Sequence, residues 1–137
     1  MGLFITIGTA IFMYFQLKKA GVDYRYFWFS LFWAIPFSMA NAFSEEAIFR
    51  LGIVSPLFGL LSVPVILLIS GAFFGIPHYF GTPSGIIGVL MAGFLGWLLA
   101  MALVETQGIF LAWAIHFVQD VVIITSIILM NKREAEK

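Results

Sequence analysis

Apolar residues fill five stretches of the chain, which short polar or glycine-rich segments separate. These stretches are residues 2–17, 26–51, 63–80, 86–104 and 109–130. A membrane-spanning helix needs about 20 mainly apolar residues, so each stretch can cross a bilayer once its ends reach the interface. The pattern predicts an all-α, polytopic membrane helix bundle with about five transmembrane helices.

The same pattern divides the chain into three parts. We expect residues 1–25 to form an N-terminal transmembrane helix and a basic loop, residues 26–130 a four-helix core, and residues 131–137 a charged tail. The first helix follows no basic segment and precedes no convincing small-residue cleavage site, so we expect a retained span and not a signal peptide. Glycines in the fourth stretch predict close packing between helices.

Composition supports a membrane protein and excludes several functions. Of the 137 residues, 62% are hydrophobic and only 10% are charged, which is more apolar surface than a soluble domain of this size could bury. The absence of cysteine excludes disulfides, thiol catalysis and cysteine-ligated metals. The formal net charge is zero and no basic patch suggests nucleic acid, so the lipid bilayer is the expected surrounding.

The basic residues predict the orientation in the membrane. Three of the seven lie in residues 18–25 and three in residues 132–137. Five crossings would place these two segments on the same side, and the positive-inside rule makes that side cytoplasmic. We therefore expect the loop and the C-terminus in the cytoplasm and the N-terminus outside.

Ionisable side chains inside the predicted spans are the strongest sign of function, because a charge in hydrocarbon costs at least a few kcal/mol. Glu46 and Arg50 are four residues apart, so they share a helix face and can form a structural ion pair. Glu45 points about 100° away from Glu46 on the same helix. Glu45 can therefore take another role.

Two further spans carry both histidines of the chain. His78 directly follows Pro77, which removes a backbone hydrogen bond to the carbonyl of Phe73 and loosens the helix. His116 and Asp120 are four residues apart and share a face. A single histidine is more often a satisfied core residue, but two histidines with acids and an arginine on three spans indicate a buried site around water. A glutamate in such a site can act as a general base toward water.

Three motifs follow one another on successive predicted helices: Glu45-Glu46-x-x-x-Arg50, Phe74-x-x-x-His78 and His116-x-x-x-Asp120. In this order, and over about residues 36–130, they resemble the CAAX protease and bacteriocin-processing family of intramembrane endopeptidases. The resemblance implies a membrane-embedded peptidase of a prokaryotic plasma membrane. Its substrate would be a membrane-associated or lipidated peptide or protein, and no substrate-binding residue can be named from the motifs.

The resemblance also assigns roles to the site residues. It implies that Glu45 activates water with help from His78. It further implies that His116 and Asp120 stabilise the oxyanion at the attacked amide, while the second acid and the arginine of the first motif are structural. Asp120 stands where the family often has asparagine, so it either donates when protonated or, when ionised, orients His116 as the donor. A glutamate and a histidine can activate water without metal, so no cofactor is favoured; if the site held zinc, the same four side chains would form the shell.

Glu45 and His78 can share a site only if they lie at a similar depth in the membrane. If residues 26–51 and 63–80 formed a simple hairpin, Glu45 and His78 would lie about 20 Å apart at a rise of about 1.5 Å per residue. A shared site then requires a re-entrant segment at residues 52–62, where glycine and proline interrupt the apolar pattern.

Two other functions remain open. A non-enzymatic membrane protein of the immunity or scaffold type could keep the buried polar set for structure or for binding a partner. A proton or ion pathway could also use glutamate, histidine and aspartate, although the chain lacks the internal repeats and paired broken helices of transporters.

Overall fold

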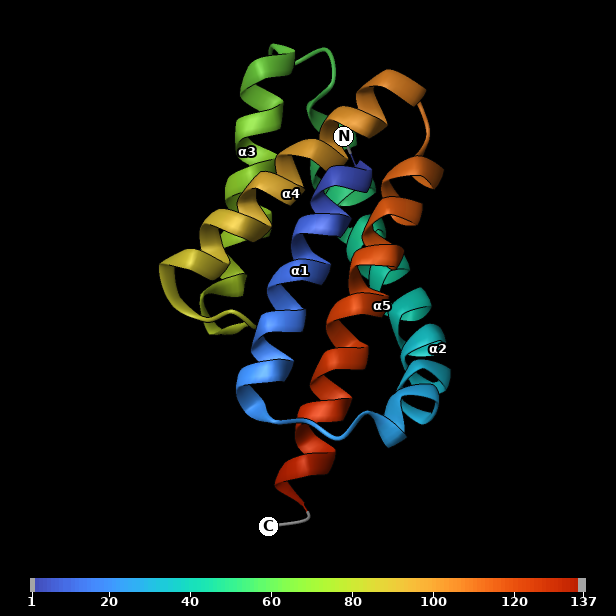
Figure 1. Cartoon of the computed structure of the whole chain (residues 1–137). Helices are drawn as coiled ribbons and strands as arrows, with labels where there is room; N and C mark the ends of the chain where they lie inside the picture. The colour runs from blue at the N-terminus through green and yellow to red at the C-terminus, as the bar shows by residue number, and fades with distance from the viewer. Residues whose placement is uncertain (1, 136–137) are drawn as a thin grey trace. The chain divides into compact units, whose positions relative to one another are not determined.

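The computed structural model describes residues 2–135, which form five α-helices joined by short 3₁₀-helical and π-helical segments (Figure 1). The helices are α1 (Gly2–Ala20), α2 (Phe27–Glu46), α3 (Val63–Gly75), α4 (Gly85–Thr106) and α5 (Ile109–Glu134). The predicted all-α fold with five helices is confirmed.

Three helical segments within the described residues are long and apolar enough to cross a membrane: Val63–Phe80, Gly85–Thr106 and Ile109–Glu134. The protein is therefore a helical membrane protein. Helices α1 and α2, with 19 and 20 residues, are not among these segments, and their crossing of the membrane stays a prediction. Helix α5 continues to Glu134, into the tail predicted at residues 131–137, of which residues 136 and 137 lie outside the described part.

The chain forms two compact units. The first unit comprises residues 2–43 and 115–135, and the second unit is Ser44–Ala114. Helices α2 and α5 each contribute residues to both units.

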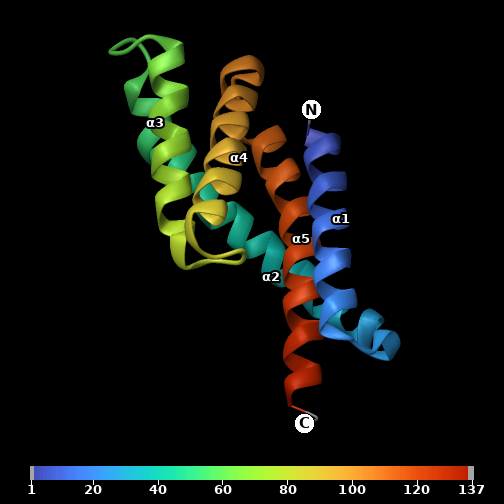
Figure 2. The ribbon, with the colours of Figure 1, turned by 60° about the vertical axis from the view of Figure 1, so that its left-hand side comes forward.

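In the first unit, α1 and α5 lie side by side and run in the same direction (Figures 1 and 2). A Cβ atom added at Gly2 would lie 3.0 Å from the Ile115 side chain, and one added at Gly21 would lie 3.5 Å from the Arg133 guanidinium. Helix α2 packs through a stripe of small side chains at every fourth position, all of them completely buried: Ser30, Ala34, Ser38 and Ala42. Small residues of this kind allow helices to approach closely within a membrane.

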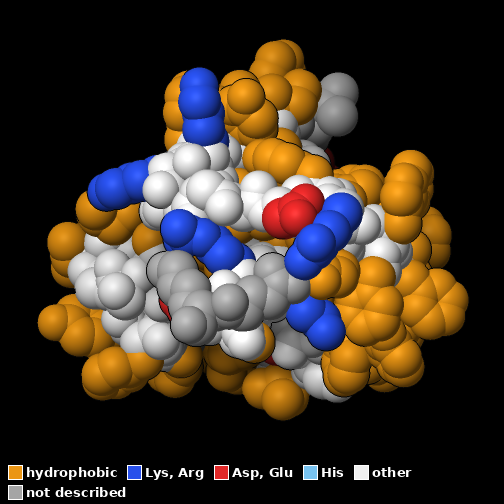
Figure 3. All heavy atoms as spheres, turned by 60° about the horizontal axis from the view of Figure 1, so that its bottom comes forward, with side chains coloured by type: hydrophobic (Ala, Val, Ile, Leu, Met, Phe, Trp, Pro, Cys, Tyr) orange, Lys and Arg blue, Asp and Glu red, His pale blue; other side chains and the backbone are white. Residues whose placement is uncertain are grey.

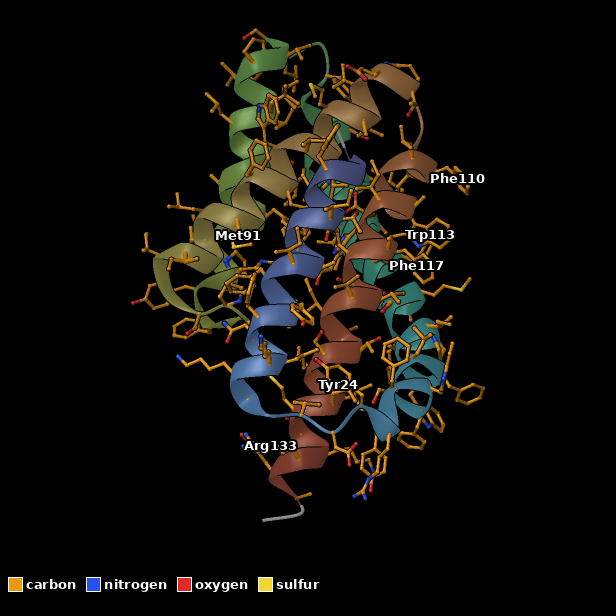
Figure 4. All side chains as sticks on the ribbon, in the orientation of Figure 1. Tyr24, Met91, Phe110, Trp113, Phe117 and Arg133 are labelled. Atoms are coloured by element: carbon orange, nitrogen blue, oxygen red, sulfur yellow. The ribbon has the colours of Figure 1, made fainter. Side chains whose placement is uncertain are left out.

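The basic loop after α1 and the end of α5 lie at the same end of the first unit. Leu17, Val22 and Leu129 form a small buried cluster there. Figure 4 shows Tyr24 and Arg133 at this end, and Figure 3 shows lysine and arginine side chains gathered around it. The two basic segments thus lie at the same end of the first unit, as five crossings would place them, and the cytoplasmic side stays a prediction.

In the second unit, α3 and α4 pack closely in opposite directions (Figures 1 and 2). A Cβ atom added at Gly96 would lie 2.5 Å from the Cβ of Phe74, and one added at Gly75 would lie 2.9 Å from the Cα of Gly93. The prediction that the glycines of the fourth stretch allow close packing is confirmed. An apolar core lies beside this contact: Val54, Ile66, Leu67, Ala100 and Leu103.

The structure corrects the re-entrant segment predicted at residues 52–62. Helix α2 continues without a break into a π-helical segment, Ala47–Val54, and then into a 3₁₀ turn, Ser55–Leu57. The chain reverses direction after this turn, and α3 begins at Val63. Val54 packs against Ile66 and Leu67 of α3, so the two helical segments form a hairpin.

Candidate functional site

Glu46 and Arg50 form the predicted ion pair in the second unit. Nε of Arg50 lies 2.9 Å from Oε2 of Glu46, and neither side chain is exposed. Nη2 of Arg50 also donates a 3.3 Å hydrogen bond to the backbone oxygen of Gly96 on α4. The guanidinium lies over the ring of Phe74 on α3, with Cζ 4.7 Å from the ring centroid. These contacts offset the cost of burying the charge and join the π-helical segment to α3 and α4.

The backbone oxygen of Gly96 is the point where three helical segments meet. It also accepts a 3.1 Å hydrogen bond from Oγ of Ser70 on α3. Residue 96 has no side chain, so Phe74 can approach α4 closely and both donors can reach the carbonyl. Ser70 was not predicted, because its side chain is not ionisable and its partner lies on another helix.

His78 lies in a 3₁₀ segment, Ile76–Phe80, that follows α3. The α-helix ends at Gly75, directly before this segment, as the prediction of a loosened helix at Pro77 requires. Nδ1 of His78 lies 2.7 Å from the backbone oxygen of Phe74. A carbonyl oxygen can only accept, so Nδ1 carries a hydrogen, and Nε2 of the neutral ring is an acceptor. The ring also stacks on that of Phe74, at 5.0 Å between centroids.

A ring contact between Phe49 and Phe74 shows how far along their two helical segments Glu45 and His78 lie. The two rings meet edge to face, with centroids 5.1 Å apart. Glu45 lies four residues before Phe49, and His78 lies four residues after Phe74. Since the two segments run in opposite directions, both side chains lie about one helical turn from the contact, toward the same end of the unit.

The predicted separation of Glu45 and His78, about 20 Å in a simple hairpin, is therefore wrong. The prediction took the second span to end near residue 51, whereas the helical path continues to Val54 and the chain turns at residues 58–62. The hairpin itself aligns the two side chains, and no re-entrant segment is needed.

The two adjacent acids differ in exposure. Glu46 is completely buried, whereas Glu45 is half-buried. This difference agrees with the prediction that the two side chains point to different helix faces.

His116 and Asp120 lie in the first unit, where they form the predicted pair along α5. Nε2 of His116 lies 3.5 Å from Oδ1 of Asp120, and the side chains are only 4% and 11% exposed. Oδ2 of Asp120 accepts a 3.0 Å hydrogen bond from Nδ2 of Asn41 on α2. Asn41 was not predicted, because its side chain is not ionisable. The signal was present, since Asn41 is an amide within an apolar stretch, four residues before Glu45.

Within the described residues, no group of three or more histidine, aspartate or glutamate side chains is placed so that it could hold a metal ion. The second unit contains Glu45 and His78, and the first unit contains His116 and Asp120. The zinc shell of these four side chains stays a prediction.

Comparison with protein-family models gives a match over residues 27–122 to the family described as Rce1-like, type II CAAX prenyl endopeptidase. The chain belongs to this family. The match covers more than half of the chain and contains all three motifs, so it confirms the family that the motifs resemble. This is a family of proteases, and membership supports peptidase activity. No curated protein and no solved structure matches the chain.

Proposed function

We propose that the chain is an intramembrane endopeptidase that hydrolyses a peptide bond in a membrane-associated or lipidated peptide or protein. Water is the nucleophile, Glu45 is the general base and His78 assists it. The observation that carries this proposal is the alignment of Glu45 and His78 by the Phe49–Phe74 contact, next to the buried ion pair of Glu46 and Arg50.

The chemistry requires one proton acceptor near the water and one group that moves the proton onward. The Glu45 carboxylate takes a proton as the water oxygen bonds to the amide carbon. That proton then passes to the amide nitrogen, the carbon–nitrogen bond breaks, and the products are a carboxylic acid and an amine. Nε2 of His78 is an acceptor in the neutral ring, so it can help to orient the same water.

The tetrahedral intermediate also needs hydrogen-bond donors for its oxyanion. The family resemblance points to His116, with Asp120 as its partner, and the 3.5 Å contact between their side chains supports the pairing. An ionised Asp120 cannot donate, so Asp120 orients His116 through Nε2–H. The donor to the oxyanion is then Nδ1–H of a protonated His116, since both ring nitrogens carry a hydrogen only in that form.

The test compares peptide termini in membranes from cells that express the native chain, Glu45→Gln or Glu105→Gln at matched levels. Glu45→Gln keeps the side-chain shape and removes the base, so we expect new termini to fall by at least about 100-fold, the lower range for loss of a general base. Glu105 is exposed at the end of α4, so Glu105→Gln is the matched control and should cleave like the native chain.

Two outcomes would change the proposal. Identical termini with native chain and Glu45→Gln, both folded, would favour the non-enzymatic alternative, in which the polar set serves structure or partner binding. Cleavage that depends on Glu45 but stops in the presence of a chelator would replace the metal-free mechanism with a metal-dependent one.

A further inference from the structure

Asp120 has one partner on each of its carboxylate oxygens. Oδ2 accepts the 3.0 Å hydrogen bond from Asn41, and Oδ1 lies 3.5 Å from Nε2 of His116. Asp120 and His116 are only 8% and 3% exposed, whereas Asn41 is exposed. Because an ionised carboxylate only accepts, Asn41 and His116 are both donors to it.

The two contacts differ in length, and the shorter one indicates a role for Asn41. The bond from Asn41 has the usual N–H···O length of about 2.7–3.2 Å, whereas the contact to His116 is longer. The carboxyl group of an aspartate turns about a torsion with broad, weakly restricted wells. The long contact to His116 holds this torsion poorly, while the bond from Asn41 fixes Oδ2 and with it the position of Oδ1.

We propose that Asn41 is a positioning residue that acts through Asp120 on His116; its effect on cleavage rests on the peptidase function proposed above. By fixing the carboxylate, Asn41 directs Nε2–H of His116 toward Oδ1 and so sets the orientation of the ring and of its other nitrogen. Asn41 lies four residues before Glu45 on α2 and so shares its helix face, which is why the test reads the state of His116 directly.

The direct test is the ring ¹⁵N spectrum of histidine in the full chain, labelled at histidine and held in lipid nanodiscs. The chain has only two histidines, and His116→Gln identifies which signals belong to His116. Asn41→Leu keeps the approximate shape and removes the donor. We expect it to shift the Nε2 and Nδ1 signals of His116 and to leave those of His78 in place. Asn131→Leu, the same change at an exposed position near the end of α5, should shift neither histidine.

A kinetic test separates positioning from a purely structural link between α2 and α5. Loss of a group that orients a metal-binding histidine lowers metal affinity or activity by about 10- to 100-fold, and we expect the same range for a histidine oriented toward an oxyanion. We expect Asn41→Leu to lower kcat by this factor with KM changed less than about twofold. In the Asp120→Asn background the same substitution should change kcat by less than about threefold, because the carboxylate through which Asn41 acts is gone.

The histidine spectrum tests the positioning role of Asn41, and the cleavage assay tests the peptidase function, so a failure of one can be told from a failure of the other. Unchanged His116 signals in folded Asn41→Leu would overturn the positioning role, whatever the activity. Equal losses of kcat from Asn41→Leu with Asp120 and with Asn at position 120 would also overturn it, since the effect would then not pass through the carboxylate. Shifted His116 signals in a chain that cleaves nothing would support the role of Asn41 and count against the peptidase function.

Discussion

At the residue scale, the buried Arg50 makes the contacts that join the most helical segments. The guanidinium reaches the carboxylate of Glu46, the backbone oxygen of Gly96 and the ring of Phe74, which lie on three helical segments. A lysine could not reproduce this set, because its ammonium is a point charge without a planar face. Arg50 therefore holds the second unit together at the level where Glu45 and His78 lie.

Removal of either partner of the buried pair should destabilise the protein strongly. Glu46→Gln leaves a buried guanidinium without a counter-charge, and Arg50→Met leaves a buried carboxylate, so each should cost about 3–5 kcal/mol of unfolding free energy. The double variant E46Q/R50M leaves no charge and should lose clearly less than the sum. Unfolding in mixed detergent micelles measures all three. Additive losses in the double variant would show that the two side chains do not act as a pair.

At the scale of the elements, the packing of α3 against α4 depends on glycine. We expect Gly96→Ala to cost about 1–3 kcal/mol of unfolding free energy, since the new methyl group would lie 2.5 Å from the Cβ of Phe74. Gly8→Ala is the matched control, because a Cβ atom added at Gly8 on α1 meets nothing within 4 Å. The control should be neutral or slightly stabilising. Equal stability of the two variants would contradict the close approach at Gly96.

Helix existence was predictable from the sequence, but helix ends and polar partners were not. Apolar runs indicate where a helix forms, and all five were found. They do not indicate that the backbone after Glu46 passes into a π-helical segment and continues to Val54, so the turn was placed too early and the depth of His78 was misjudged. The pairs of Glu46 with Arg50 and of His116 with Asp120 follow from four-residue spacing. Asn41 and Ser70 could not be placed in the same way, because their partners lie on other helices.

At the scale of the whole molecule, the remaining question is the orientation in the membrane. Helices α1 and α5 run in the same direction within the first unit, so the basic loop and the end of α5 face the same side. Helix α5 has 26 residues, about 39 Å at 1.5 Å per residue, which exceeds the thickness of the hydrocarbon core, about 30 Å. Its two ends therefore lie on opposite sides when it crosses.

Single cysteines test this arrangement directly, because the native chain has none. Lys19→Cys and Lys132→Cys should react with a membrane-impermeant maleimide in inverted vesicles and not in intact cells, since the positive-inside rule places both in the cytoplasm. Glu105→Cys, at the end of α4 that leads into α5, should show the opposite pattern. Labelling of Lys19→Cys and Lys132→Cys from different sides would contradict the parallel course of α1 and α5. If all three labelling patterns were reversed, α1 and α5 would still run in the same direction, but the protein would have the opposite orientation in the membrane. The charge distribution would then not account for that orientation.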